Sequence, residues 1–233
     1  MEIVLGIVSA IIIFLLREAL IHARQQKEIA ARLFSYVTHW KYNIIFEDGI
    51  FKLSQVGIKW QDELTKLIRA GTNIKEAIKV DEKYEGIIND LFIKIEENSD
   101  NLTEELKQGF IKLESGDDLK NETLSILRST KESILSGKTF ITDQDAAKLG
   151  HHYSYVCVRL KLHLISLIDS AIFTLQAFDS NNLEYSKYKK HLEDILRVAI
   201  LISKDIQLLS ESLDRYTSSS VFTIAFSNLN YDL

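Results

Sequence analysis

Hydrophobic residues open the chain as one unbroken run and then recur at helical spacing. The run from residue 3 to residue 16 carries no charge, and only Gly6 and Ser9 dilute its hydrocarbon character. Its large apolar members are Ile3, Val4, Leu5, Ile7, Val8, Ile11, Ile12, Ile13, Phe14, Leu15 and Leu16. The rest of the chain is charged and amphipathic. The pattern therefore predicts one membrane anchor followed by amphipathic helices.

The apolar run by itself is shorter than a membrane-spanning helix. A spanning helix needs roughly 20 residues to cross about 30 Å of hydrocarbon. The segment 1–21 reaches this length because Ala19, Leu20 and Ile21 continue the apolar face, and Arg17 can extend its charge to the headgroups. A buried or interfacial helix is the alternative. A cleaved signal peptide fits less well, since no basic residue precedes the run and no A-x-A site follows it.

Basic residues that follow the run indicate the orientation of the anchor. They are Arg17, Arg24, Lys27 and Arg32, and no Lys or Arg precedes the run. The positive-inside rule then predicts a single-pass protein with its N-terminus outside and its C-terminal bundle in the cytoplasm. The single cysteine, Cys157, fits a reducing compartment because it has no partner for an internal disulfide.

The remaining pattern predicts an all-α fold. Ile29, Leu33, Val37, Trp40 and Ile44 form a helical stripe that continues from the anchor without a breaker. The sequence has no proline and only 9 glycines, which favours long helices over a sheet protein rich in turns. We therefore expect an elongated cytoplasmic helical bundle over 22–217, with a stalk helix at 22–46 and middle helices at 50–136.

The last part of the bundle is predicted as a long antiparallel hairpin over 143–217. Thr142 resembles a helix cap, and the helix it opens runs to about Phe178 with a possible irregularity at Gly150. The stretch 160–178 is apolar nearly all round. It is read as a core helix because Asp169 near its middle makes a second membrane span costly.

Register within this hairpin predicts two structural charge pairs. Residues equally far from the turn at 179–182 lie level, which places Arg159 near Asp205 and Asp169 near Arg197. Buried charges are normally paired, so both pairs are expected to fix the register of the hairpin. The tail, 218–233, is expected to fold back as a cap, with a partner-docking strand as the alternative.

Composition and motifs argue against most chemistries. Net charge is −5, with 28 basic and 33 acidic residues intermixed, so no nucleic-acid partner is expected. The stretch 136–139 reads Ser-Gly-Lys-Thr but has Glu132 where a P-loop needs its first glycine. The six histidines lack the spacings of di-iron or zinc sites, and His151–His152 is interpreted as an exposed or half-buried pair, not as metal ligands. We expect no catalytic residue, cofactor or metal.

Two Arg-to-His spacings leave one enzymatic alternative open. Arg17 to His22 and Arg32 to His39 resemble the loose motif of HEPN-type helical ribonucleases, a spacing that also arises by chance in such a chain. The sequence favours a non-enzymatic, membrane-anchored protein that binds a partner or self-associates as a scaffold or sensor, partly through coiled-coil-like helices. A membrane-acting effector or pore component that oligomerises through its anchor is the main alternative, and a helical nuclease is the other.

Overall fold

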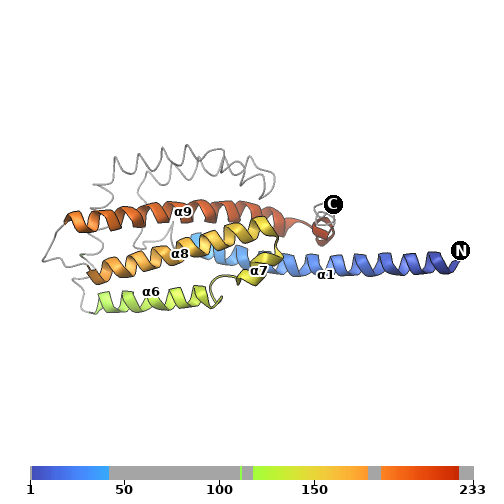
Figure 1. Ribbon diagram of the computed structural model, residues 1–233, viewed down its shortest axis with the longest axis horizontal. Helices are drawn as coiled ribbons and strands as arrows, with labels where there is room; N and C mark the ends of the chain where they lie inside the picture. The colour runs from blue at the N-terminus through green and yellow to red at the C-terminus, as the bar shows by residue number, and fades with distance from the viewer. Residues whose placement is uncertain (1, 42–110, 112–117, 178–184, 226–233) are drawn as a thin grey trace.

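The computed structural model describes residues 2–41, 111, 118–177 and 185–225, with the side chains of the first eight residues and of parts of the last helix left aside. Every regular element within these residues is an α-helix (Figure 1). They are α1 (Glu2–Lys41), α6 (Leu119–Leu135), α7 (Asp143–Lys148), α8 (His151–Ala177) and α9 (Tyr185–Ser218). The predicted all-α class is confirmed for the described residues. The predicted helices between 50 and about 113, and the end of the stalk at 42–46, lie outside them.

Helix α1 has two parts with different surroundings. Its first half projects beyond the other helices, and its second half lies alongside α9 (Figure 1). The burial pattern shows this change, because Ala23 is the first fully buried residue among the described side chains of α1. From there the predicted stripe continues through Ile29, Leu33, Val37 and Trp40, all of which are buried. The spacing of three and four residues keeps them on one face.

Helices α8 and α9 run side by side in opposite directions and form the centre of the bundle (Figure 1). Near the start of α8, Tyr153 contacts the last turns of α9, while Arg159 contacts Asp205 earlier in α9. The buried face of α8 includes Leu160, Leu164 and Leu175, so the apolar stretch predicted as a core helix does contribute to the core. The residues that connect the two helices, 178–184, lie outside those described.

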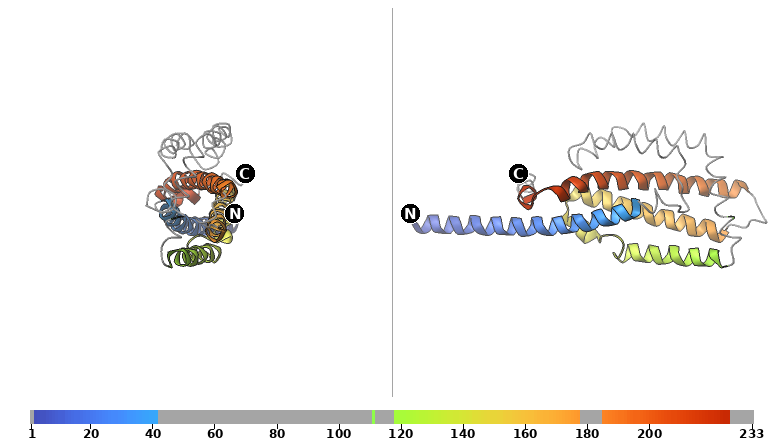
Figure 2. Two further views of the ribbon diagram at one scale, coloured as in Figure 1. Left: turned by 90° about the vertical axis from the view of Figure 1, so that its left-hand side faces the viewer. Right: turned by 180° about the vertical axis from the view of Figure 1, so that it is seen from behind.

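Helix α6 covers the side of α8 that faces away from α9. The end-on view in Figure 2 places α6 and α9 at opposite edges of the described bundle. Leu124 and Ile134 are buried in the common core, whereas Ile126 and Leu135 are exposed. Helix α6 ends at Leu135, and Gly137 follows with a backbone φ of +74°, a left-handed conformation common for the glycine that terminates a helix.

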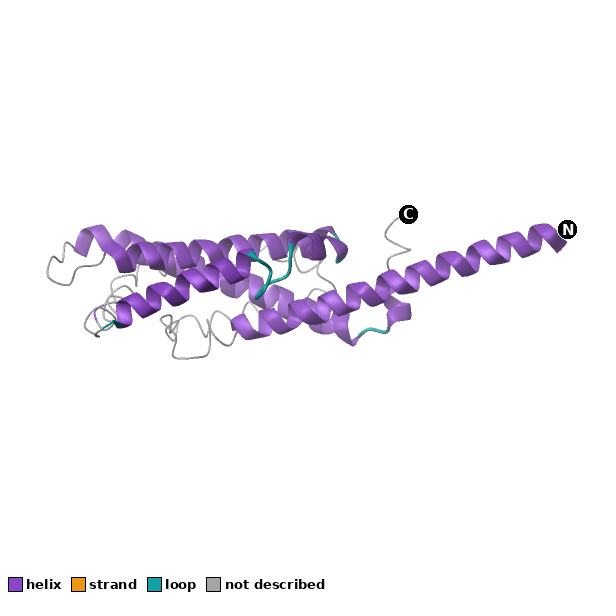
Figure 3. Cartoon of the chain, turned by 90° about the horizontal axis from the view of Figure 1, so that it is seen from below, coloured by secondary structure: helices purple, strands orange, loops and turns teal. Residues whose placement is uncertain are grey.

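The expected helix from 143 to about 178 is divided in two. Thr142 does cap it, since its Oγ1 accepts a hydrogen bond from the Asp145 N–H at 3.1 Å. Gly150 then adopts a φ of +98°, a conformation that L side chains rarely reach, and the chain enters α8 in a new direction. Leu149 and Gly150 thus separate α7 from α8, and Figure 3 draws the described elements as helices joined by loops.

The C-terminal tail folds back onto α1. Residues 221–225 form a helical turn after α9, and Ile224 and Ala225 are buried against Ala23. Ala19 and Leu20 pack against the same small cluster. The turn lies beyond the end of α9, beside α1 where that helix leaves the bundle (Figure 2). The predicted cap is thus seen as far as residue 225.

Candidate functional site

The projecting half of α1 exposes a run of large apolar side chains. All six residues from Ile11 to Leu16 are exposed, with fractions between 42% and 66%. Consecutive residues in an α-helix are turned by about 100°, so six in succession cover every face of the helix. An amphipathic helix would expose apolar side chains along one stripe only. This segment is therefore apolar all round and uncovered by the described part of the bundle.

Over the residues that the structure describes, none of the helices is apolar over a long enough stretch to cross a membrane. Five members of the predicted anchor, namely Ile3, Val4, Leu5, Ile7 and Val8, have side chains outside the described set.

The four basic residues predicted to set topology have two kinds of surroundings. Arg17 and Arg24 are exposed on the part of α1 that leaves the bundle. Lys27 donates a hydrogen bond to the Ser219 carbonyl at 2.7 Å, and Arg32 bonds Asp145 of α7 at 3.3 Å. The first two face solvent next to the apolar run, and the last two hold other segments against α1.

A buried polar junction fastens α1 to the rest of the bundle just past the exposed run. The Gln26 side chain is 6% exposed; its Nε2 donates to the Lys148 carbonyl at 2.7 Å, and its Oε1 accepts from the Tyr216 hydroxyl at 3.2 Å. It thereby joins α1 to the end of α7 and the end of α9. Burial raises the pKa of Tyr216 to about 12. The Tyr216 ring also meets that of Tyr153 edge to face, with centroids 5.7 Å apart.

This junction was not predicted from the sequence, although one signal was present. Gln26 lies three residues before Ile29, on the line of the apolar stripe. A polar side chain at such a position must find internal partners once the stripe is buried. Neither partner was identifiable from the sequence. One of them, the Lys148 carbonyl, is available to Gln26 because α7 ends at that residue.

The structure does bring Arg159 and Asp205 together in the middle of the bundle. Asp205 is fully buried, and its Oδ1 accepts from both Nε, at 2.8 Å, and Nη2 of Arg159. His163, one turn further along α8, places Nδ1 3.0 Å from the other carboxylate oxygen. Both oxygens of the buried carboxylate are therefore engaged, as such a group requires. The Arg159 guanidinium also lies 5.2 Å from the centre of the Tyr155 ring.

Asp169 pairs with a residue of α6. Its carboxylate accepts from Lys131, with Nζ 2.6 and 2.7 Å from the two oxygens. The hairpin register that predicted Arg197 considered α9 alone, and that pairing stays a prediction. The packing of α6 on α8 was not indicated by the sequence. The Lys131 side chain is 32% exposed and that of Asp169 50%, and their ion pair fastens α6 to α8.

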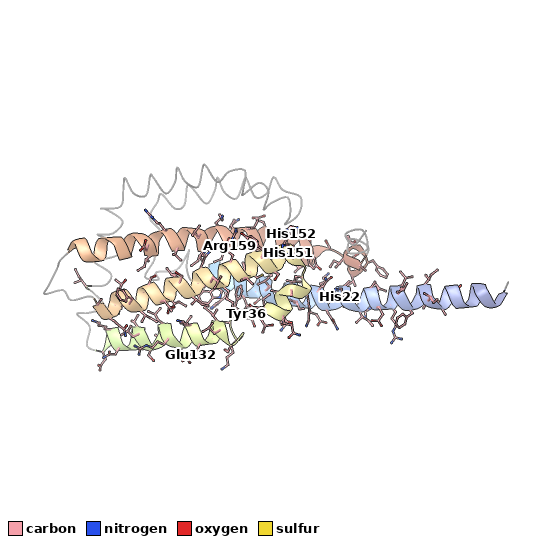
Figure 4. The ribbon with its side chains drawn as sticks, viewed as in Figure 1. His22, Tyr36, Glu132, His151, His152 and Arg159 are labelled. Atoms are coloured by element: carbon pink, nitrogen blue, oxygen red, sulfur yellow. The ribbon has the colours of Figure 1, made fainter. Side chains whose placement is uncertain are left out.

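The side chains considered for catalysis or metal binding lie apart. Figure 4 shows His22 on α1, and His151 and His152 together at the start of α8. Of the two Arg–His spacings, Arg32 bonds Asp145, while the His39 ring meets Trp40. Within the described ranges, no group of three His, Cys, Asp or Glu side chains could hold a metal ion.

Two further motifs take structural positions. Gly137 and Thr139 of the P-loop-like stretch belong to the loop after α6, where Trp40 Nε1 donates to the Thr139 carbonyl at 3.3 Å. A P-loop would instead lead from a strand into a helix. Cys157 lies in the core, where burial, and secondarily the charge of Asp205, raise its pKa to about 12. A thiol held this far from ionisation is a poor nucleophile.

Comparison of the chain with protein-family models, with characterised proteins and with solved structures finds no match.

Proposed function

We propose that this protein is a single-pass, membrane-anchored helical bundle that serves as a non-enzymatic interaction or sensor module. The observation that carries the proposal is the dual character of α1. One uninterrupted helix bears the exposed apolar run Ile11–Leu16 and, from Ala23 onward, a stripe buried in the bundle. A displacement of the first part is transmitted to the second, because the helix between them has no break.

Insertion of the exposed run into a bilayer is energetically favourable. The eleven large apolar residues between Ile3 and Leu16 contribute about 3 to 7 kcal/mol to insertion, at 0.3 to 0.6 kcal/mol each. In water the same side chains would form an apolar surface on every side of a projecting helix, a feature that soluble monomers avoid. Arg17 and Arg24, both exposed, would lie at the cytoplasmic headgroups and keep the bundle on that side.

The polar interior of the bundle supports an interaction role over a catalytic one. Arg159 and His163 both bond Asp205, and Gln26 and Tyr216 tie helix ends together. These groups hold helices in register, and a module that transmits the position of its anchor needs such register. The partner is then a second copy of the chain or another protein bound by the bundle.

Flotation of the full-length chain with phospholipid vesicles tests the anchoring. Replacing both Ile12 and Ile13 by Arg adds about 5 to 7 kcal/mol to the cost of insertion, enough to cancel the apolar gain. We expect the wild-type chain to float with the vesicles and the Ile12→Arg/Ile13→Arg chain to stay in the dense fraction.

A matched control separates insertion from a general effect of added charge. Ile126 on α6 is 57% exposed, comparable to Ile12 and Ile13, but lies in the bundle. The Ile126→Arg chain should float like the wild type. Flotation of the double-arginine chain at the wild-type level would overturn the proposal.

A further inference from the structure

The turn at 221–225, here called the tail turn, occupies a specific position along α1. It packs on Ala19, Leu20 and Ala23, which follow the exposed run by three to seven residues. At 1.5 Å per residue this is about 5 to 10 Å beyond Leu16 along the helix axis. The headgroup layer of one leaflet is about 5 to 8 Å thick. If the run that ends at Leu16 lies in hydrocarbon, Ala19 and Leu20 lie at its boundary with the headgroups, and the tail turn lies level with that boundary.

Several contacts hold the tail turn in this place. Lys27 donates to the Ser219 carbonyl at 2.7 Å, immediately before the turn. The Ser220 Oγ then accepts from the Thr223 N–H at 3.0 Å, which starts the helical turn. Ile224 and Ala225 are buried against Ala23. The turn is therefore fixed against α1 by its own apolar residues, and the side chains that do not pack on α1 form its outer surface.

One large apolar residue remains on that outer surface. Phe222 is 62% exposed, although its neighbours at 224 and 225 are buried. Exposed Arg17 and Arg24 flank the stretch of α1 on which the turn packs. An exposed aromatic ring on a turn that packs on a stretch of α1 bounded by two arginines matches the boundary between phospholipid headgroups and acyl chains, where aromatic rings and arginines both gather.

We propose that the tail turn is a second membrane contact, in which Phe222 inserts into the headgroup layer next to the end of the anchor. This inference rests on the proposed insertion of α1. Two contacts at one side of the bundle would fix its tilt against the bilayer, whereas α1 alone would let the bundle swing. The tail thus makes the orientation of the bundle depend on the membrane surface.

Site-specific fluorescence on the full-length chain tests the proposal. Single cysteines replace Ile13, Phe222 or Phe173, and each is labelled with an environment-sensitive dye; buried Cys157 stays unlabelled in the folded protein. Phe173 is the matched control, because it is an exposed phenylalanine near the end of α8 remote from the tail turn. Each chain is reconstituted in vesicles of phosphatidylcholine and phosphatidylglycerol. Quenching is measured with a nitroxide lipid and with aqueous iodide.

We expect the dye at position 222 to be quenched by a nitroxide near the headgroup and shielded from iodide, and the dye at 173 to show the reverse. A dye at 13 in the hydrocarbon with a dye at 222 open to iodide would overturn the tail contact alone. A dye at 13 open to iodide would overturn the anchoring, and the tail contact with it. The two failures are therefore distinguishable.

Discussion

Asp205 is the residue whose burial is hardest to sustain, because a carboxylate with no exposed surface needs nearby cations or donors. Arg159 and His163 supply them from successive turns of α8, so the carboxylate fixes the register between α8 and α9. Whether such a group adds net stability depends on what would replace it, but removing one partner alone is always costly. A shift of α8 against α9 would separate these groups and would therefore cost free energy.

Replacing Arg159 by Met should lower the free energy of unfolding by about 3 kcal/mol, because Asp205 would keep its burial and lose its main cation. Chemical denaturation of the full-length chain in detergent measures this. Lys131→Met is the matched control, since its ion pair with Asp169 is about half exposed and should be worth no more than about 1 kcal/mol. Equal losses in the two variants would contradict the account of the buried cluster.

Cys157 makes a second prediction at the same scale. Burial raises its pKa from the ordinary value of 9.0 to about 12, so the thiolate fraction near pH 8 falls about a thousandfold. A thiol reagent should modify the native chain at least that much more slowly than the unfolded chain. Modification of the native chain at the rate of a free cysteine would contradict the burial of this residue.

The same shift has a consequence for stability at high pH. Because the folded-state pKa lies above the unfolded value, the folded chain keeps its proton where the unfolded chain has lost it. The buried, protonated Cys157 thiol therefore makes its full contribution to the free energy of unfolding below pH 9. This contribution is lost as the pH rises from 9 toward 12. Tyr216, whose pKa is also raised to about 12, acts in the same direction above pH 10.

The turns before and after α7 set the directions of the neighbouring helices. Gly137 and Gly150 both have positive φ, and an added Cβ at Gly137 would also lie 2.9 Å from Thr142 Cγ2, whereas Gly150 has open space. Gly150→Ala should destabilise the chain by about 1 to 2 kcal/mol from backbone strain alone. Gly137→Ala should cost more than this. Thermal unfolding of the two variants gives the order, and the reverse order would contradict the geometry of these turns.

Some features of the helices were predictable because the sequence carries a local physical signal for them. The stripe from Ile29 to Trp40 repeats at helical spacing, and Arg159 and Asp205 lie level in any antiparallel arrangement of the last two helices. The break at Gly150 was harder to predict, since glycine permits a turn without requiring one. Lys131 as the partner of Asp169 was missed, because it depends on which helix packs beside α8.

For the whole molecule, the central feature is that bundle and projecting segment share one helix. The junction at Gln26 and the contacts of Lys27 lie within a few turns of the apolar run, so the attachment is concentrated where α1 enters the bundle. The tail turn packs on Ala19, Leu20 and Ala23, and the described side chains before it, at residues 9–18, are exposed. A helix without tertiary contacts is only marginally stable in water. The stability of the projecting segment of α1 therefore depends on what surrounds it.

Amide hydrogen exchange of the full-length chain in phospholipid vesicles tests this dependence most directly. The account predicts that amides between residues 9 and 16 exchange as slowly as those of the α8 core, because hydrocarbon excludes water from the helix. The Ile12→Arg/Ile13→Arg chain, with the same vesicles, should lose this protection and keep that of α8. Rapid exchange of residues 9–16 in the wild-type chain, alongside a protected α8, would contradict the claim that this segment of α1 lies in the bilayer.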